Sequence, residues 1–232
     1  QANRILGSGQ TSLAKFLFIA AEGDAPGLTT HDIPAFFRHV LERVDWTRDL
    51  HFHTKTTIDT LDYSGSGWNA GSKVVVACRG EKQRELKAEL PDGFTLPDGF
   101  GEPRFVQPGI LAVQGPAFSG EDSYADCDKL TRHLERFDLE SVPLLLLVDD
   151  SAFTAATLNN YLWVTYTRAN PSHDIHGVRP FTEHKHWGCR GPLLIDARTK
   201  PHHAPPLVTD PEVSRRVDAL FAKNGELYGL DQ

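Results

Sequence analysis

Short apolar runs alternate with amphipathic segments along the chain, and this alternation restricts the fold more than any other feature. The apolar runs have the length of buried strands. They span residues 16–21, 49–54, 73–78, 109–114, 142–150, 174–179 and 191–197. The segments with helical periodicity span residues 30–44, 122–137, 154–169 and 210–225. Strands and helices in alternation predict an α/β fold, a layered Rossmann-like sheet with largely parallel strands.

Two of the predicted helices carry clear start signals. Thr30 is the expected N-cap of the first helix, with Pro34 in its first turn, where a helix tolerates proline. Asp210 is the expected cap of the last helix, with Pro211 at its first position. This last helix is expected to stop near Gly225.

The two parts of the chain also share residues at matching places. "ERVDWTRDLHF" near residue 45 aligns with "TRANPSHDIHG" near residue 170, each between a helix and a strand. At one constant offset the aligned pairs are Arg43 with Arg168, Asp49 with Asp174, Leu50 with Ile175, and His51 with His176. Downstream, "WNAGSKVVVA" parallels "WGCRGPLLIDA". Two matches in the same order predict an internally duplicated βαββ unit.

This duplication divides the chain into two halves. The first half, residues 1–115, contains a Pro/Gly-rich excursion at 90–109, where "LPDGF" occurs twice. Pro-Asp-Gly is typical of turns, so the excursion is expected at the surface. The second half, residues 116–232, ends with the C-terminal helix. We expect the two halves to form one compact domain.

Charge and composition exclude some classes of protein. The 232 residues carry a formal net charge of −7, and no stretch clusters enough Lys and Arg to neutralise several phosphates. We therefore expect no nucleic-acid partner and at most peripheral membrane contact. No apolar run approaches the roughly 20 residues of a membrane helix. Three scattered cysteines favour a reduced, cytoplasmic protein. Because the chain contains no Met, we expect a processed chain or a piece of a longer one.

The stretch "DYSGSGWNAGSKVVVAC", residues 62–78, has the composition of a phosphate-binding loop. A P-loop, however, follows a strand and opens a helix, and its Lys comes directly after the last Gly. Here the glycines precede a strand, and Ser72 separates Gly71 from Lys73. "GSGQTSLAK", residues 7–15, fails in the same way. The sequence therefore does not predict a nucleotide site.

Several segments together resemble the C-terminal domain of the UbiD family of carboxy-lyases. The family shows "GAGQ" before the first strand, then "LDVLDHS", a Gly-Gly-Lys strand start, and "IDATRK" late in the chain. The corresponding segments here are residues 7–10, 58–64, 71–73 and 195–200. The order and spacing agree over almost the whole chain, and the branch for 4-hydroxy-3-polyprenylbenzoate or menaquinone-type decarboxylation is nearest. Tyr63 departs from the pattern, since His is usual there, and "VVVAC" replaces a version that contains Asp.

This resemblance implies a lyase of quinone biosynthesis that catalyses non-oxidative decarboxylation of aromatic or α,β-unsaturated acids. In the family, an N-terminal portion binds prenylated FMN with a divalent metal, Mn or Mg, and carries the catalytic Glu-Arg-Glu set. Nothing in this chain matches that portion. The chain is thus expected to be the oligomerising, pocket-covering C-terminal domain, inactive alone. Its partners would be its own missing flavin domain, further copies of itself, and an aromatic acid substrate.

The resemblance also implies site residues. The stretch before the glycines covers the substrate pocket in better-known relatives, which places Thr56, Ile58 and Leu61 in the pocket wall by position. The other interpretation is that Ile58 and Leu61 are ordinary core or loop residues. We expect no catalytic, cofactor-binding or metal-binding residue within this chain.

Other residue patterns point to chemistry less strongly. His51 with His53, His184 with His186, and His202 with His203 form pairs, but no Cys or carboxylate completes a metal set at a recognisable spacing. A nucleophile pair of Cys189 and His186 lacks an oxyanion motif, so we expect a buried structural Cys. Carboxylates follow the ends of two equivalent strands. At that place they could bind a ligand, as in open α/β sheets, or cap the helix that comes next. These are Glu22, Asp24, Asp149 and Asp150.

Two functions of different classes therefore remain open. The first is the C-terminal domain of a UbiD-like decarboxylase. The second is a stand-alone, non-catalytic α/β binding or scaffold module. Both predict an oligomer, to which the last helix and the largely apolar helix at 154–169 could contribute, but only the first predicts an upstream flavin domain. A metal-dependent or P-loop-like hydrolase is a distant third.

Overall fold

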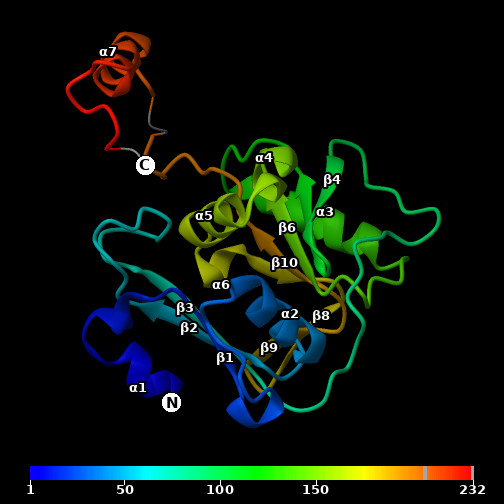
Figure 1. The fold of residues 1–232 in the computed structure, drawn as a ribbon. Coiled ribbons are helices and arrows are strands. Elements are labelled where there is room, and N and C mark those ends of the chain that lie inside the picture. The colour runs from blue at the N-terminus through cyan, green and yellow to red at the C-terminus, as the bar shows by residue number, and fades with distance from the viewer. Residues whose placement is uncertain (206–207, 231–232) are drawn as a thin grey trace.

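The computed structural model describes residues 1–205 and 208–230, and it confirms the α/β class (Figure 1). The first main sheet contains β1 (Phe16–Ala20), β2 (Leu50–Thr56) and β3 (Gly71–Cys78) in the order β1-β3-β2. The second has the order β4-β5-β6-β10-β7. Its strands are β4 (Gly101–Gln107), β5 (Ile110–Gln114), β6 (Leu144–Val148), β7 (Ile175–Gly177) and β10 (Leu193–Asp196). Strands β8 (Pro180–Glu183) and β9 (His186–Cys189) form a hairpin. Both main sheets are mixed, whereas largely parallel strands were predicted.

The helices include the four predicted ones, one of them divided in two, and two short ones at residues 2–6 and 171–174 that were not predicted. They are α1 (Ala2–Leu6), α2 (Ile33–Arg43), α3 (Ala125–Leu134), α4 (Ser151–Ala156), α5 (Leu158–Arg168), α6 (Pro171–Asp174) and α7 (Pro211–Phe221). The predicted cap Thr30 is wrong, because the Asp32 carboxylate accepts the Ala35 N–H at 3.0 Å. The predicted helix at 154–169 is interrupted at Thr157, which is extended and caps α5. Asp210 caps α7 as predicted.

The two main sheets repeat one arrangement of three strands. β1 is parallel to β3 and β2 is antiparallel to it; likewise β6 is parallel to β10 and β7 is antiparallel to it. The registers also agree with the sequence alignment. Phe16 pairs with Val74 as Leu144 pairs with Leu193, and Leu50 pairs with Val76 as Ile175 pairs with Ile195. The duplication remains a prediction, and these shared registers support it.

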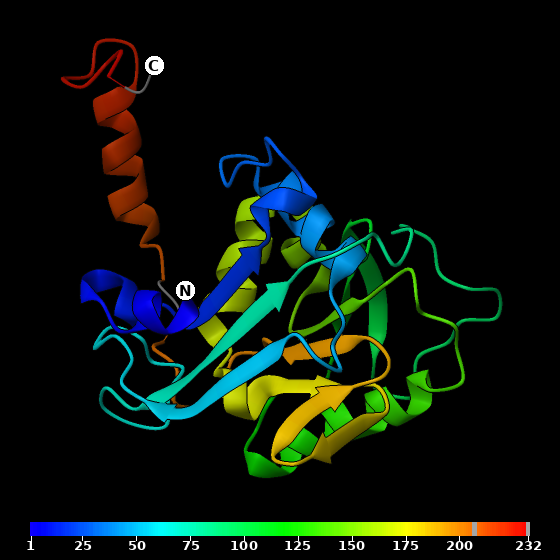
Figure 2. The same cartoon turned by 90° about the horizontal axis from the view of Figure 1, so that it is seen from below.

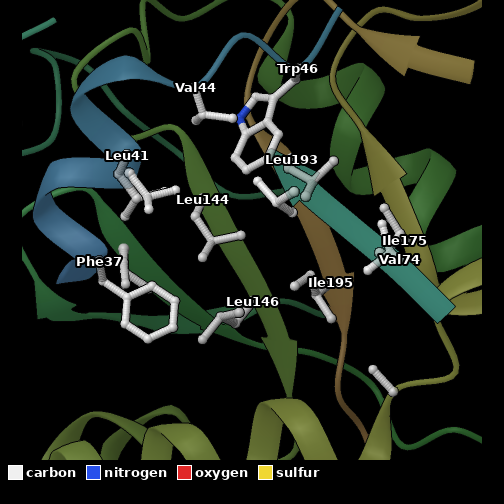
Figure 3. Close-up of a cluster of buried hydrophobic side chains, with 14 of the residues drawn as sticks. Phe37, Leu41, Val44, Trp46, Val74, Leu144, Leu146, Ile175, Leu193 and Ile195 are labelled. Atoms are coloured by element: carbon white, nitrogen blue, oxygen red, sulfur yellow. The ribbon is translucent and has the colours of Figure 1, made fainter. Parts of the chain in front are cut away.

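The main apolar core lies between the two sheets and takes side chains from both predicted halves (Figure 3). Phe37, Leu41 and Val44 of the α2 region face Leu144 and Leu146 of β6 in this core. Trp46 reaches across as well, donating its indole N–H to the Pro143 carbonyl at 2.9 Å. The boundary placed at residue 115 falls between β5 and β6, which are hydrogen-bonded neighbours. The division into halves therefore stays a prediction.

The Pro/Gly-rich excursion is more ordered than predicted. Both copies of "LPDGF" form turns, closed by hydrogen bonds from Phe94 N–H to Pro91 and from Phe100 N–H to Pro97. Gly93 adopts a positive φ of 71°, which glycine accommodates without strain. The apolar residues of the excursion then pack on a second core cluster. Strand β4, which was not predicted, occupies its end and pairs with β5.

Helix α7 stands away from the rest of the molecule in both views (Figures 1 and 2). None of its residues is buried. In both views α1, the loop before β3 and α7 lie on the same side of the molecule. Among residues 1–205 and 208–230, no helix is both long enough and apolar enough to span a bilayer.

Candidate functional site

Two of the segments that carry the family resemblance, residues 58–64 and 195–200, meet at one cleft of about 680 Å³. One wall is the segment 57–70, which connects β2 to β3 and is called the glycine loop below. The opposite wall comes from residues 118–124, from Asn170, His173 and Asp174 at α6, and from residues 200–202. Segments distant in sequence are thus brought together, as in a binding site at the junction of elements.

The glycine loop is held in a fixed shape by close packing. Ile58 is only 1% exposed and lies beneath Gly65 and Gly71, where a Cβ would come within 2.5 and 2.8 Å of its Cδ1. Ser66 N–H also donates to the Ala70 carbonyl at 2.8 Å. Gly65 and Gly71 are therefore needed for the close approach of this loop to Ile58.

Lys15 fixes the same loop from the N-terminal segment. Its ammonium lies 2.9 Å from an Asp62 carboxylate oxygen and also donates to the Ser64 hydroxyl and to the Thr167 carbonyl. Burial lowers the pKa of Lys15, and the Asp62 charge opposes that shift. Asp62 in turn accepts the Ser64 N–H at 2.9 Å. A buried ion pair with these extra hydrogen bonds orients the loop.

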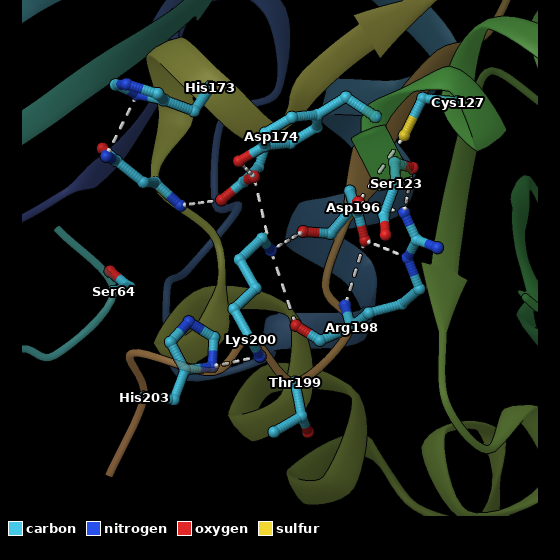
Figure 4. A network of polar contacts seen from close by, with 12 residues as sticks. Ser64, Ser123, Cys127, His173, Asp174, Asp196, Arg198, Thr199, Lys200 and His203 are labelled. Atoms are coloured by element: carbon cyan, nitrogen blue, oxygen red, sulfur yellow. Dashed lines mark hydrogen bonds and ion pairs between the residues drawn. The ribbon is translucent and has the colours of Figure 1, made fainter. Parts of the chain in front are cut away.

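The opposite wall of the cleft contains a second buried ion pair, Lys200 with Asp174 (Figure 4). The Lys200 ammonium lies 3.3 Å from Asp174 Oδ1, and both side chains are almost fully buried. Tyr124 donates its hydroxyl to the same Oδ1 at 3.0 Å, and Asn170 N–H donates to Oδ2 at 2.6 Å. Burial raises the pKa of the Asp174 carboxyl, and the Lys200 charge opposes this shift. The group is fully hydrogen-bonded, as a rigid wall requires.

Arg198 anchors the loop that forms the far wall. Its side chain is fully buried and forms hydrogen bonds to Asp196 at 2.9 and 2.7 Å and to Asp126 at 2.7 Å. It also donates to the carbonyls of Pro116 and Ser123. Burial alone would raise the pKa of the Asp196 carboxyl, but the hydrogen bonds from Arg198 and the Lys200 charge lower it. Such a planar, bidentate arrangement suits arginine and not lysine.

Three of the four carboxylates at the strand ends, Asp24, Asp149 and Asp150, have structural partners. Asp149 accepts the Thr199 N–H at 2.8 Å and pairs with Arg168 at 2.9 Å. Asp150 caps α4 by accepting the Phe153 N–H at 2.8 Å. Asp24 accepts the Gly80 N–H at 2.6 Å. These contacts correspond to capping and loop anchoring, the alternative to ligand binding.

The predicted pocket-wall residues do not line this cleft. Thr56 ends β2 and is half-buried, Ile58 is buried beneath the glycines, and Leu61 is 81% exposed. Their role in a substrate pocket stays a prediction. Our interpretation of the sequence missed Lys15, Tyr124 and the Lys200–Asp174 pair. The signal available for the last was the alignment of Asp174 with Asp49 and the charges that follow the strand at 191–197.

In residues 1–205 and 208–230 no group of three or more His, Cys, Asp or Glu side chains could hold a metal ion. The three cysteines are buried, and burial raises the pKa of the Cys78 thiol to about 11 and of the Cys189 thiol to about 12. His186 contacts the Thr47 carbonyl at 2.9 Å instead of Cys189. Cys189 is therefore the buried structural thiol that was predicted.

Comparison with known proteins agrees with the resemblance. Residues 1–78 match the family described as the 3-octaprenyl-4-hydroxybenzoate carboxy-lyase C-terminal domain, UbiD_C. A Chlamydia pneumoniae protein, named as one of the subunits of a 4-hydroxybenzoate decarboxylase, is 33% identical over 98% of this chain and 37% of its own length. An uncharacterized Chlamydia trachomatis protein is 32% identical over 95% of this chain and 36% of its own. These matches support the UbiD family for this chain.

The chain spans about a third of the length of the curated relatives it matches. A solved vanillic acid decarboxylase from Sedimentibacter hydroxybenzoicus, in its open form, aligns with 73% of this chain and 45% of that one. Over this alignment the sequence identity is 12% and the TM-score is 0.33.

Proposed function

We propose that this chain is the C-terminal component of a UbiD-like decarboxylase that acts on aromatic or α,β-unsaturated acids. The observation that carries the proposal is the pair of sequence matches. One joins residues 1–78 to the UbiD C-terminal domain. The other joins nearly the whole chain to a relative named as part of a decarboxylase.

The proposal assigns the chemical step to the rest of the protein. Prenylated FMN and a divalent metal, Mn or Mg, would be bound there, as the family resemblance implies. The role of this chain is then to supply a rigid wall beside the substrate. The glycine loop is anchored by the buried Ile58 and Lys15, and the Lys200–Asp174 pair is itself buried and hydrogen-bonded, so both can supply a rigid wall. Thr56, Ile58 and Leu61 are the proposed pocket wall, and the menaquinone-type branch and cytoplasmic location are part of the same proposal.

Helix α7 supports a homo-oligomer. Val213, Val217 and Leu220 recur at helical spacing and are 51%, 44% and 38% exposed. An exposed apolar stripe on a helix that packs little against the rest of its own chain is typical of a contact between subunits. We propose that α7 contributes to contact with another copy.

The test begins by reading the gene upstream of Gln1. The full natural gene product is then expressed with a source of prenylated FMN, and its decarboxylation activity is measured. Release of CO₂ from 4-hydroxybenzoate or a related acid is expected, with no release from cofactor-free protein. A start codon just before Gln1, with no flavin partner, would instead favour the stand-alone binding or scaffold module. Inactivity of the full, cofactor-loaded protein on a broad panel of aromatic and unsaturated acids would contradict the proposed function.

A further inference from the structure

Histidines from two distant parts of the sequence line a second cleft, of about 600 Å³, beside β2. His51 comes from β2, His184 and Lys185 from the turn between β8 and β9, and His186 from the start of β9. β2 is an end strand of its sheet, and both β9 and α6 pack against it (Figures 1 and 2). Among the described residues, this cleft shares none of its lining with the cleft at the glycine loop.

The described residues that line this second cleft include bases and no carboxylate. The carboxylates on neighbouring elements each have a partner within the chain. They are Asp45 with Thr47, Asp49 with Arg48, Asp174 with Lys200, and Glu183 with Arg190. The other titratable groups on these elements are His53, Lys55, Lys73, His173 and His176, together with the buried thiols of Cys78 and Cys189. The cleft therefore gathers positive charge in a chain whose formal net charge is −7.

The turn that carries His184 and Lys185 has an unfavourable backbone for these residue types. Their φ angles are 49° and 67°, so both central positions of this two-residue hairpin turn are left-handed. Asn-Gly is the usual sequence for such a turn, because it adopts positive φ with the least strain. Strained residues of this kind are concentrated at ligand sites, where the side chain has a function. The turn thus loses backbone stability and places an imidazole and an ammonium at the cleft.

His186 has one ring nitrogen fixed by the chain. Its Nε2 lies 2.9 Å from the Thr47 carbonyl, and because a carbonyl only accepts, this nitrogen carries the hydrogen. Nδ1 is then the nitrogen that binds the next proton, which makes the ring a cation. Histidine is the residue type that changes its charge between about pH 5 and 8. The positive charge of the cleft therefore rises on acidification.

Part of the lining is apolar and aromatic. Leu50 and Ile175 are buried, and the rings of Phe52 and Trp187 meet edge to face with their centroids 5.7 Å apart. The volume is in the range of sites for small organic molecules, which combine an apolar lining with a few polar groups. Such a lining suits an anion that has a flat apolar body.

We propose that this cleft binds a small organic dianion, a phosphate ester or a dicarboxylate. Its charged groups would contact His51, His184, Lys185 and His186, and its apolar body would lie against the aromatic rings. Several bases with no carboxylate among them favour a divalent over a monovalent anion. The inference concerns binding alone and does not depend on the proposed function.

Isothermal titration calorimetry of the natural full-length protein tests the site, with isophthalate, phenyl phosphate and sulfate as probes. Isophthalate and sulfate keep their charge between about pH 6 and 8, so a change in their affinity reports on the histidines. Isophthalate should bind about fivefold or more tightly at the lower pH, because each added charge attracts it. Sulfate has no apolar body and should bind more weakly than isophthalate. Tighter binding of phenyl phosphate than of isophthalate identifies a phosphate ester, and the reverse identifies a dicarboxylate.

Variants at the cleft locate the binding. His184→Asn with Lys185→Gly removes two bases and gives the turn its preferred sequence, so the Tm should be equal or higher. Its affinity for isophthalate should nevertheless fall about tenfold or more. His51→Gln, from the β2 side of the cleft, should weaken binding several-fold without altering the turn.

The matched control is His31→Asn with Lys87→Gln. It removes the same residue types from exposed positions outside the cleft and should leave the affinity unchanged. Failure of all three probes to bind would overturn the proposal. So would an affinity for isophthalate that is the same at both pH values, or equal affinities for the cleft variants and the unmodified protein. A protein that binds isophthalate as expected but releases no CO₂ would contradict the proposed function alone.

Discussion

At the scale of single residues, Arg198 is the side chain on which most of the cleft depends. It is fully buried, holds the buried Asp196, and ties the loop at 116–123 to the end of β10. Two charges removed from water are stabilised only while they remain paired. Each partner therefore depends on the other.

Replacing Arg198 by Ala should lower the free energy of unfolding by about 3–5 kcal/mol, because Asp196 would remain buried without its partner. Urea denaturation followed by fluorescence measures this change. Arg104→Ala is the control: it breaks an exposed pair with Glu102, 57% and 63% exposed, and should cost no more than about 1 kcal/mol. Similar losses for the two variants would contradict the role given to Arg198.

His203 makes stability depend on pH. Burial, and then the charge of Lys200, lower its pKa from 6.5 to about 4, and its Nε2 has no hydrogen-bond partner among the described residues. The unfolded chain therefore binds more protons between pH 4 and 6.5. The free energy of unfolding should rise with pH through this window and fall on acidification.

Discounted for partial exposure, this contribution should be about 1–2 kcal/mol. His203→Asn keeps an acceptor for the Lys200 N–H and removes the titration, so its unfolding free energy should fall less on acidification than that of the unmodified protein. His202→Asn, at the exposed neighbour, is the control. If the free energy of unfolding fell by the same amount on acidification for His203→Asn and for the unmodified protein, this role of His203 would be contradicted.

At the scale of elements, the glycine loop depends on close backbone approach. A Cβ at Gly65 would overlap the Ala70 carbonyl and lie 2.5 Å from Ile58 Cδ1. Gly65→Ala should therefore destabilise the protein by about 1–3 kcal/mol, measured as a shift of the urea midpoint. Gly23→Ala is the matched control, since its Cβ would meet nothing within 4 Å. An unchanged midpoint for Gly65→Ala would show that the loop is not packed as described.

Sequence patterns predicted the helices and strands better than they predicted contacts between distant side chains. The strands at 16–20 and 144–148 were predictable because each is a short, continuous apolar run; β6 is buried throughout and β1 is half-buried. Strand β4 was missed because Pro103 and the preceding Pro/Gly-rich turns are typical of loops. The break at Thr157 was missed because the apolar pattern continues through it. The cleft was not predictable, since Lys15 with Asp62 and Asp174 with Lys200 are joined only by the tertiary fold.

At the scale of the whole molecule, α7 predicts self-association. Val217→Asp should reduce the mass found by light scattering after size exclusion, because a carboxylate in an apolar contact loses its hydration. Ala219→Asp adds the same charge to another, exposed side of the helix and should leave the mass unchanged. A monomeric unmodified protein, or equal masses for all three, would contradict the proposed contact.

The core that the two sheets share determines how the chain should behave when it is divided after residue 115. Phe37 and Leu41 lie against Leu144 and Leu146, and Trp46 bonds to Pro143, so neither 1–115 nor 116–232 encloses its own apolar surface. Each fragment alone should be largely unstructured by circular dichroism and should bind a hydrophobic dye. Mixed in equal amounts, the two should restore the native spectrum by complementation. The two predicted halves would then depend on each other for folding and would not be separable folding units.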